Sequence, residues 1–262
     1  MSCPTCAAQV SLQSINRKAM QFIAQFREKP DVEQSDYAFH LKRLWPIIEA
    51  LASKDQRLGN WFLKGETEEE ARLYPVYESN ATPSTAVLAV LRERYRGEEQ
   101  LAKTIGIWNG QTIKRDGAAL SLGIDRSSMP CDFDLSVGEE NVASSRLGNF
   151  DSVAHIVAAI VGAYGPAYVT VGPRKYAAKQ VFDDKPGAGW MIYLPKVITA
   201  QQVPEARALI PVPQAGRKQT GTIIVSVTDA VFSVSNPEHL EVANRIEIRL
   251  VDQDLLPRYS DI

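Results

Sequence analysis

Two long segments of the chain place apolar residues at the spacing of an amphipathic helix. From Tyr37 onward, apolar positions recur every three or four residues, and Pro46 lies either at the start of this helix or at a kink inside it. Residues 151–164 carry the clearest apolar stripe, and Gly165-Pro166 directly after them is a typical helix end. The pattern therefore predicts two substantial helices, well separated in the chain.

Two further helices are predicted between them. Thr67 followed by Glu70 has the spacing of a capping box, in which the two side chains satisfy backbone N–H groups of the first turn. Residues 84–95 place apolar side chains on one helical face. The first of these helices would begin inside an acidic run.

Between residues 104 and 136 the apolar period shortens, and the pattern becomes that of strands. Short apolar or alternating runs are separated there by Asn109-Gly110 and Asp116-Gly117, which are strong hairpin signals. This stretch predicts an antiparallel meander. Two later apolar runs, residues 168–171 and 191–194, are predicted strands as well.

The C-terminal segment predicts a strand, a returning strand, a helix and a last strand. Residues 222–227 have the composition of a buried strand, and residues 231–234 are its predicted hairpin partner. Asn236 is a helix cap followed by a proline and an acid. Residues 245–250 alternate charged and apolar side chains, which predicts a strand, whereas residues 204–209 fit a short helix.

Together these elements predict an α+β fold with a mixed or mainly antiparallel sheet and helices packed on one side. Residues 1–36 are left as a poorly assigned N-terminal extension, because the apolar window from Met20 to Phe26 fits helix and strand equally. Residues 37–262 would form one domain. The order of the elements leaves open two related halves, 37–145 and 146–262.

Composition excludes several classes of protein. The chain has 262 residues, and 29 Lys and Arg against 31 Asp and Glu give a net charge of −2, which argues against a generic nucleic-acid binder. There is no run of eighteen apolar residues for a membrane span and no secretory pattern at the N-terminus. Three cysteines do not make a disulfide framework. We expect a cytoplasmic protein.

Catalytic and metal-binding motifs are sparse. Cys3 and Cys6 have metal-ligand spacing, but neither Cys131 nor a paired histidine completes a zinc site, so we expect no metal and no cofactor. Asp132 and Asp134 are spaced to share one face of a strand. A catalytic pair would need a third group that the sequence does not supply, so the alternatives are a solvated strand face and an acidic surface for a basic protein. We expect no enzyme.

Two sets of residues carry a resemblance to a known family. The first set comprises Leu51, Asp55, Leu58, Trp61, Gly65, Glu70, Ala71 and residues 107–110. The second comprises Phe232 and residues 221–225, 236–239, 243–244 and 247–250. Together they resemble the immunity protein 52 family of bacterial polymorphic toxin systems, from about residue 37 to the C-terminus.

The resemblance implies a non-enzymatic α+β protein that is encoded beside a secreted toxin and neutralises it in the producing cell. Such proteins are typically paired with restriction-endonuclease-like nuclease toxins, often delivered by a type VI secretion system. The implied partner is therefore a cognate toxin with a nuclease domain. Neither nucleic acid nor a membrane is an expected partner.

A nuclease must present a basic groove to phosphates, and an inhibitor can fill that groove with carboxylates and aromatic anchors. The candidate toxin-binding residues are accordingly Trp61, Glu66, Glu68, Glu69, Glu70, Trp108, Asp132, Asp134, Glu139 and Glu140. The alternative for each acid is a solvated surface position without a partner. The alternative for each tryptophan is a position in the hydrophobic core. The alternative for the whole protein is an α+β ligand-binding or scaffold module, whose sign would be a closed apolar pocket near Tyr164, Tyr168 and Trp190.

Overall fold

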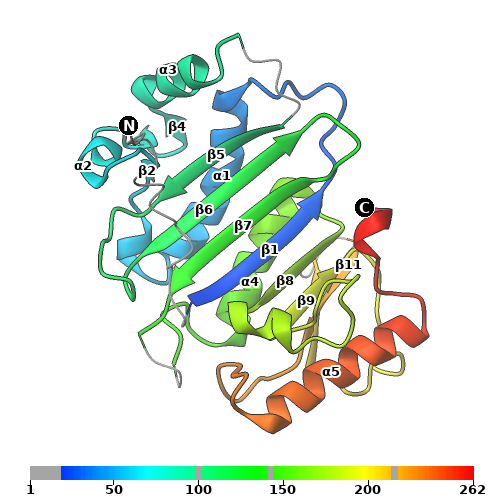
Figure 1. Ribbon diagram of the computed structural model, residues 1–262. Helices are drawn as coiled ribbons and strands as arrows, with labels where there is room; N and C mark the ends of the chain where they lie inside the picture. Colours follow the sequence, from blue (N-terminus) through cyan, green and yellow to red (C-terminus); the bar gives the residue numbers. More distant parts are fainter. Residues whose placement is uncertain (1–18, 98–101, 141–143, 214–217) are drawn as a thin grey trace, which may run out of the picture.

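The computed structural model describes residues 19–97, 102–140, 144–213 and 218–262, and one large sheet dominates it (Figure 1). Its strands, in chain order, are β1 (Ala19–Phe26), β2 (Phe62–Leu63), β5 (Ala102–Trp108), β6 (Ala118–Asp125), β7 (Cys131–Gly138), β8 (Tyr168–Pro173), β9 (Met191–Leu194), β10 (Ala208–Val212) and β11 (Gly221–Val225). Across the sheet their order is β10-β11-β9-β8-β1-β7-β6-β5-β2. A separate hairpin pairs β3 (Tyr77–Ser79) with β4 (Thr82–Pro83).

The helices are α1 (Tyr37–Ala52), α2 (Glu68–Arg72), α3 (Thr85–Arg94), α4 (Phe150–Tyr164) and α5 (Pro237–Asp252). Short 3₁₀ turns form η2 (Gln56–Leu58), η3 (Arg174–Ala178) and η4 (Tyr259–Asp261). Among the described residues, none of these helices has the length and apolar character needed to cross a membrane. The pairings between the named strands are all antiparallel, which confirms the predicted α+β class.

β1 lies in the middle of the sheet. It contains the apolar window from Met20 to Phe26, whose sequence fits helix and strand equally. β1 pairs with β7 on one side, where Phe26 faces Cys131, and with β8 on the other, where Gln25 faces Tyr168. Its residues alternate between a buried face, which includes Phe22 and Phe26, and a partly exposed one. The strand joins the predicted β5–β6–β7 meander, which is confirmed, to the strands of the second half of the chain.

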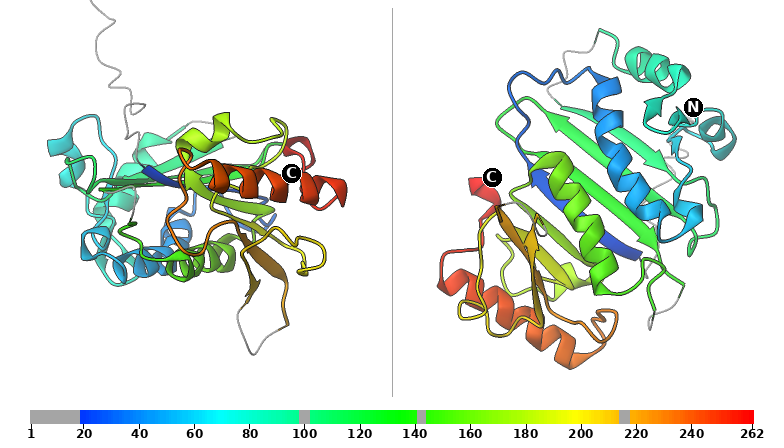
Figure 2. Two further views of the ribbon diagram at one scale, coloured as in Figure 1. Left: turned by 90° about the horizontal axis from the view of Figure 1, so that it is seen from below. Right: turned by 180° about the vertical axis from the view of Figure 1, so that it is seen from behind.

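One face of the sheet is covered by α1 and α4, which pack side by side on it (Figure 2, right). Asp36 caps α1 by accepting a hydrogen bond from the backbone N–H of Phe39, and Pro46 lies inside that helix. Gly165 ends α4 in the left-handed conformation, at φ 53°, which a residue without Cβ adopts at least cost. Both long helices are confirmed, and they bury the main core of the protein against the inner face.

The opposite face is covered only at one end, by α5. In β9, Met191 and Tyr193 belong to the core under α4, whereas Ile192 and Leu194 pack with α5 in a second core. The predicted packing of helices on one side thus holds for α1 and α4 but not for α5. The rest of this outer face, over β1, β7, β6 and β5, carries no helix (Figures 1 and 2).

Three predicted elements of the second half are wrong. Residues 245–250 are the last turns of α5 rather than a strand, because Ile246 and Leu250, four residues apart, face the sheet together. Residues 231–234 form no strand. The antiparallel neighbours of β11 are β9 and β10, and β10 includes Ala208 and Leu209 from the segment predicted as a short helix.

Candidate functional site

The acidic run after Gly65 folds as the short helix α2 with the predicted cap. Thr67 Oγ1 accepts a hydrogen bond from the Glu70 N–H at 3.1 Å, and the Glu70 carboxylate accepts one from the Glu66 N–H at 3.1 Å. Carboxylates in the first turn are favourable because backbone N–H groups point toward them there. The side chains of Glu66, Glu68 and Glu69 in and before this first turn are exposed.

Beside α2, the side chain of Trp108 lines a hollow of about 310 Å³. Trp108 is half-buried at the end of β5, and the Arg72 guanidinium lies 5.5 Å from its ring centroid. The indole N–H is buried and has no hydrogen-bond partner among the described residues. The other side chains around the hollow are a mixture of acidic, small and polar groups, namely Lys64, Glu66, Thr67, Glu68, Ala71, Gln111, Thr112, Lys114, Ala118 and Ala119. Trp108 and the α2 acids therefore share one recess.

Asp132 and Asp134 project from β7 onto the open face of the sheet, as their spacing predicts. Gln21 of β1 donates hydrogen bonds from Nε2 to both carboxylate oxygens of Asp134, at 3.0 and 3.1 Å. Burial raises the pKa of Asp132, and the negative charge of Asp134 raises it further. A Cβ atom at Gly123 of β6 would lie 2.1 Å from the Asp132 Oδ1, so glycine is what makes room for this carboxylate.

Lys64, which sequence reasoning did not single out, connects these two groups of acids. Its alkyl chain crosses Gly106 of β5, where a Cβ atom would lie 3.1 Å from the Lys64 Cδ. It lines both the Trp108 hollow and a second hollow of about 140 Å³, whose wall also includes Asp134 and Arg174. Burial lowers the pKa of Lys64, and the Asp134 carboxylate opposes that shift. No local sequence signal marks such a lysine, because its role depends on a glycine one strand away.

The remaining candidate residues lie elsewhere. Trp61 is buried, and its indole N–H donates to the Leu58 carbonyl at 2.7 Å. Glu139 is also buried and accepts hydrogen bonds from the Ser145 hydroxyl at 2.5 Å and the Arg146 N–H at 3.0 Å. Burial raises the pKa of Glu139, and these hydrogen bonds oppose the rise. Glu140 is exposed next to it, 3.7 Å from Arg115. None of these side chains lines the hollows described above.

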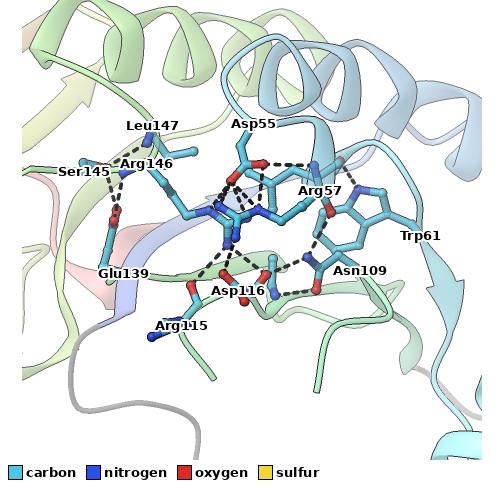
Figure 3. Close-up of polar contacts among 12 residues, drawn as sticks. Asp55, Arg57, Trp61, Asn109, Arg115, Asp116, Glu139, Ser145, Arg146 and Leu147 are labelled. Carbon is cyan, nitrogen blue, oxygen red and sulfur yellow. Dashed lines mark hydrogen bonds and ion pairs between the residues drawn. The ribbon is translucent and has the colours of Figure 1, made fainter. Parts of the chain in front are cut away.

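A network of charged side chains fixes the β5–β6 loop, which forms one wall of the Trp108 hollow (Figure 3). Arg146 donates from Nε to Asp55 at 2.8 Å and from Nη1 to the Asp116 carbonyl at 2.8 Å. Arg57 bridges the carboxylates of Asp55 and Asp116, at 2.9 and 2.5 Å. Burial alone would raise the pKa of Asp55, but hydrogen bonds from Arg57 and Arg146 outweigh it and lower the pKa to about 2.

Asn109 completes this anchoring from inside the loop. Its amide nitrogen donates to the carbonyls of Arg57 and Asp116, at 3.1 and 2.9 Å, and its side-chain oxygen accepts from the Ala118 N–H at 2.7 Å. Both amide hydrogens and the side-chain oxygen of the buried Asn109 are thus engaged, and these bonds close the hairpin and attach it to η2. The Asn-Gly signal predicts the turn, but the contacts with η2 and residue 146 depend on the tertiary fold.

Within the parts of the chain that the structure describes, no group of three or more His, Cys, Asp or Glu side chains is arranged to hold a metal ion. Cys3 and Cys6 lie outside the described residues, and Cys131 is buried. Tyr164 and Trp190 belong to the core under α4, whereas Tyr168 belongs to the core under α5, so these three do not share one pocket.

Comparison with known proteins points to one family. The family model described as Immunity protein 52 matches residues 33–258. A solved structure of a Pseudomonas aeruginosa T6SS protein, PA0821, is similar to this chain with a TM-score of 0.48 and 10% sequence identity, over 89% of this chain and 76% of that one. No curated protein matches.

Proposed function

Because the chain belongs to the immunity protein 52 family, we propose that it binds and neutralises a toxin that carries a nuclease domain of the restriction-endonuclease-like type. It acts by protein–protein interaction in the cytoplasm of the producing cell and performs no catalysis. The toxin is delivered by a type VI secretion system, and the immunity protein protects the cells that make it.

The observation that carries this proposal is the position of the α2 acids beside the Trp108 hollow. Glu66, Glu68 and Glu69 are exposed, and Trp108 presents a partly accessible ring with an unsatisfied N–H next to them. An interface needs a large aromatic anchor that loses water on binding and charges that match the partner. A nuclease must hold phosphates with cations, so its substrate groove is the surface that these carboxylates fit.

Asp132 and Asp134 extend the acidic surface over the sheet. Their mutual repulsion is a cost that the free protein bears, and a cationic partner would relieve it. Glu139, Glu140 and Trp61 are left out of the proposed contact surface, because two of them are buried and the third lies away from the hollows.

Co-expression tests the function. The toxin encoded beside this chain should kill or arrest cells when it is expressed alone, and growth should be restored when this chain is expressed with it. Failure of the wild-type chain to rescue growth, with both proteins visible on a gel, would contradict the proposal.

Charge reversal tests the surface. Glu66→Lys, Glu68→Lys and Glu69→Lys together should weaken binding of the catalytically inactivated toxin about 100-fold or more, because favourable contacts become repulsive. Glu70 is kept, since it supports the α2 cap. The matched control is Glu49→Lys, Glu93→Lys and Glu241→Lys, three exposed acids on other helices. If the two triple variants bind equally well, the α2 acids are not in the interface.

A further inference from the structure

The open face of the sheet forms a groove between two walls. One wall, here called the α2 wall, comprises Glu66, Glu68, Glu69 and Glu70. The other, here called the η3 wall, comprises Arg174, which lines two of the hollows, and the exposed Lys175 and Lys179 beside it. The backbones of α2 and η3 lie on the side of the sheet opposite α1 and α4, as the view along the sheet shows (Figure 2, left). Between them run β5, β6, β7 and β1.

Several outward positions near the middle of the groove floor carry small side chains. Gly106, Ala119, Ser121 and Ser136 occupy these positions on β5, β6 and β7. Exposed sheet faces that meet only water usually carry long polar side chains. Here the hollow beside α2 is joined to the one beside Arg174 through shared lining residues, so the depression is continuous across the strands.

Two charges at the centre of the floor compensate one another. Lys64 lies flat over Gly106 and is favoured in its charged form by Asp134, which in turn accepts two hydrogen bonds from Gln21. The charge of Asp134 at the centre of the groove is therefore compensated and hydrogen-bonded. Two residues along β7, Asp132 adds an exposed carboxylate to the floor, so a partner segment would meet small side chains, this one carboxylate and the charges of the walls.

The two walls carry opposite charge. The α2 wall carries four carboxylates against three nearby cations, Lys64, Arg72 and Lys114, and Arg72 is paired with Glu68 at 2.9 Å. On the η3 wall, Arg174, Lys175 and Lys179 are exposed. A partner that fits both walls must carry basic groups along one side and acidic groups along the other.

The width of the floor indicates the kind of element that fits. Because η3 contacts β1, the floor between the walls extends from β5 to β1, three strand spacings or about 14 Å at roughly 4.8 Å per spacing. The wall side chains narrow this gap, and an α-helix with its side chains measures about 10–12 Å across. One helix fits between the walls, and two do not.

We propose that this groove holds a single helix of the toxin, whose basic flank lies along the α2 wall and whose acidic flank lies along the η3 wall. The inference rests on the proposed function, since it specifies how the immunity protein contacts its toxin. Small floor residues allow the helix to approach the sheet closely. The opposite charges of the walls fix its direction of docking, because a helix turned end for end would place like charges together.

Filling the floor tests the groove. Ser121→Trp places an indole at the centre of the floor, in a strand position that favours aromatic residues. Binding of the full-length protein to the inactivated toxin, measured by titration calorimetry, should weaken about 100-fold, as for loss of a central interface contact. Ser79→Trp, on the exposed surface of β3, is the matched control and should bind as the wild type does. Equal binding by Ser121→Trp would overturn the inference.

Reversing the η3 wall tests its charge without touching a buried residue. Arg174→Glu, Lys175→Glu and Lys179→Glu together should weaken binding about tenfold or more. The control Lys29→Glu, Lys42→Glu and Arg92→Glu makes the same change of net charge at exposed positions outside the groove. Unchanged binding, or tighter binding as expected for a uniformly basic partner, would overturn the polarised groove.

The outcomes separate this inference from the function on which it rests. If the wild-type chain neither binds the toxin nor rescues growth, the proposed function fails and the groove fails with it. If the wild type does both, and the floor and η3-wall variants do both equally well, the function stands and only the groove is wrong. Circular dichroism and thermal unfolding of each variant confirm that a lost interaction is not a lost fold.

Discussion

Lys64, directly after β2, donates its backbone N–H to the Gly106 carbonyl of β5 at 2.9 Å, and its side chain lies over the glycine Cα. A Cβ atom at residue 106 would stand 3.1 Å from the Lys64 Cδ and 3.7 Å from its Cβ and Cγ. This contact keeps the lysine flat on the sheet and directs its amine toward the middle of the open face, beside Asp134. The absence of a side chain at Gly106 thus allows the Lys64 side chain to lie against the sheet.

Gly106→Val should lift Lys64 off the floor. Because the displaced atoms belong to a flexible side chain, the free energy of unfolding should change by less than about 1 kcal/mol. Toxin affinity should nevertheless fall about tenfold, since the raised amine obstructs close approach. Urea denaturation and titration calorimetry measure the two effects. Gly162→Ala, at an exposed helical position with no neighbouring atoms within 4 Å, should leave binding unchanged.

Asp132→Asn should stabilise the free protein at neutral pH. The folded-state pKa of Asp132 is raised by burial and by Asp134, so the folded state is penalised when this carboxylate is ionised. That penalty is absent below the unfolded pKa and grows as pH rises through the folded pKa. The advantage of asparagine should therefore be present at pH 7 and vanish near pH 3, as measured by urea denaturation. If the difference in free energy of unfolding between Asp132→Asn and the wild type is the same at pH 7 and pH 3, the prediction is wrong.

The same substitution should weaken toxin binding. In this role the Asp132 carboxylate lowers the stability of the free protein and raises the affinity for a cationic partner. Such an exchange of stability for function is common at functional sites. Loss of affinity with gain of stability separates this role from a structural one. If Asp132→Asn lowers stability and leaves affinity unchanged, the carboxylate acts within the fold instead.

Asp55 should make the protein sensitive to strong acid. Its folded-state pKa of about 2 lies below the ordinary value of 3.8, because Arg57 and Arg146 hold its charged form. The resulting stabilisation, on the order of 2 kcal/mol, is complete above the unfolded pKa and is lost as pH falls from about 4 to about 2. Asp55→Asn should therefore cost stability at pH 7 and cost little at pH 2. The exposed control Asp31→Asn should change stability by less than about 0.5 kcal/mol at either pH.

Glu247→Ala should loosen the η3 wall. The buried Glu247 carboxylate accepts hydrogen bonds from the Tyr176 hydroxyl at 2.5 Å, the Val181 N–H at 2.7 Å and the Ala188 N–H at 2.8 Å. The Tyr176 hydroxyl keeps Asn244 Oδ1 as an acceptor at 3.1 Å, whereas the N–H groups of Val181 and Ala188 lose theirs, which should cost about 3 kcal/mol. Amide hydrogen exchange should accelerate at residues 181 and 188. Glu241→Ala, on the exposed side of the same helix, should change neither quantity measurably.

The elements that sequence analysis predicted well are those with one period and clear end signals. α1, α4 and the β5–β7 meander each bury one regular stripe, and their caps or turns are local in sequence. Local preference and tertiary packing agree there, so the pattern is sufficient.

Prediction failed where the apolar residues fit both the helical and the strand period. Residues 245–250 alternate, but Ile246 and Leu250 also lie four apart, and the buried Glu247 disguises the helical stripe. β1 shows the converse case, because Ile23 is apolar on the face opposite Phe22 and Phe26 and thereby obscures its alternation. Only the neighbouring strands decide between the two periods.

For the candidate site, the sequence does not show which of the candidate residues lie together. Trp61 and Trp108 have similar neighbours in sequence, yet one is buried and the other lines a hollow. Glu139 and Glu140 are adjacent, and one of them is buried in a loop contact. Arg174 lies in a basic cluster visible in the sequence, whereas Lys64 carries no local signal, and the positions of both cations opposite the acids follow from strand order.

The central position of β1 has a consequence for when protection begins. Its two neighbours, β7 and β8, are made long after it, so β1 waits unpaired on the ribosome until residues 131–138 and 168–173 have emerged. Pairings so distant in sequence also form slowly once the chain is released. A cell that switches on toxin and immunity genes together therefore faces a delay, and the order and rate of their translation become part of its defence.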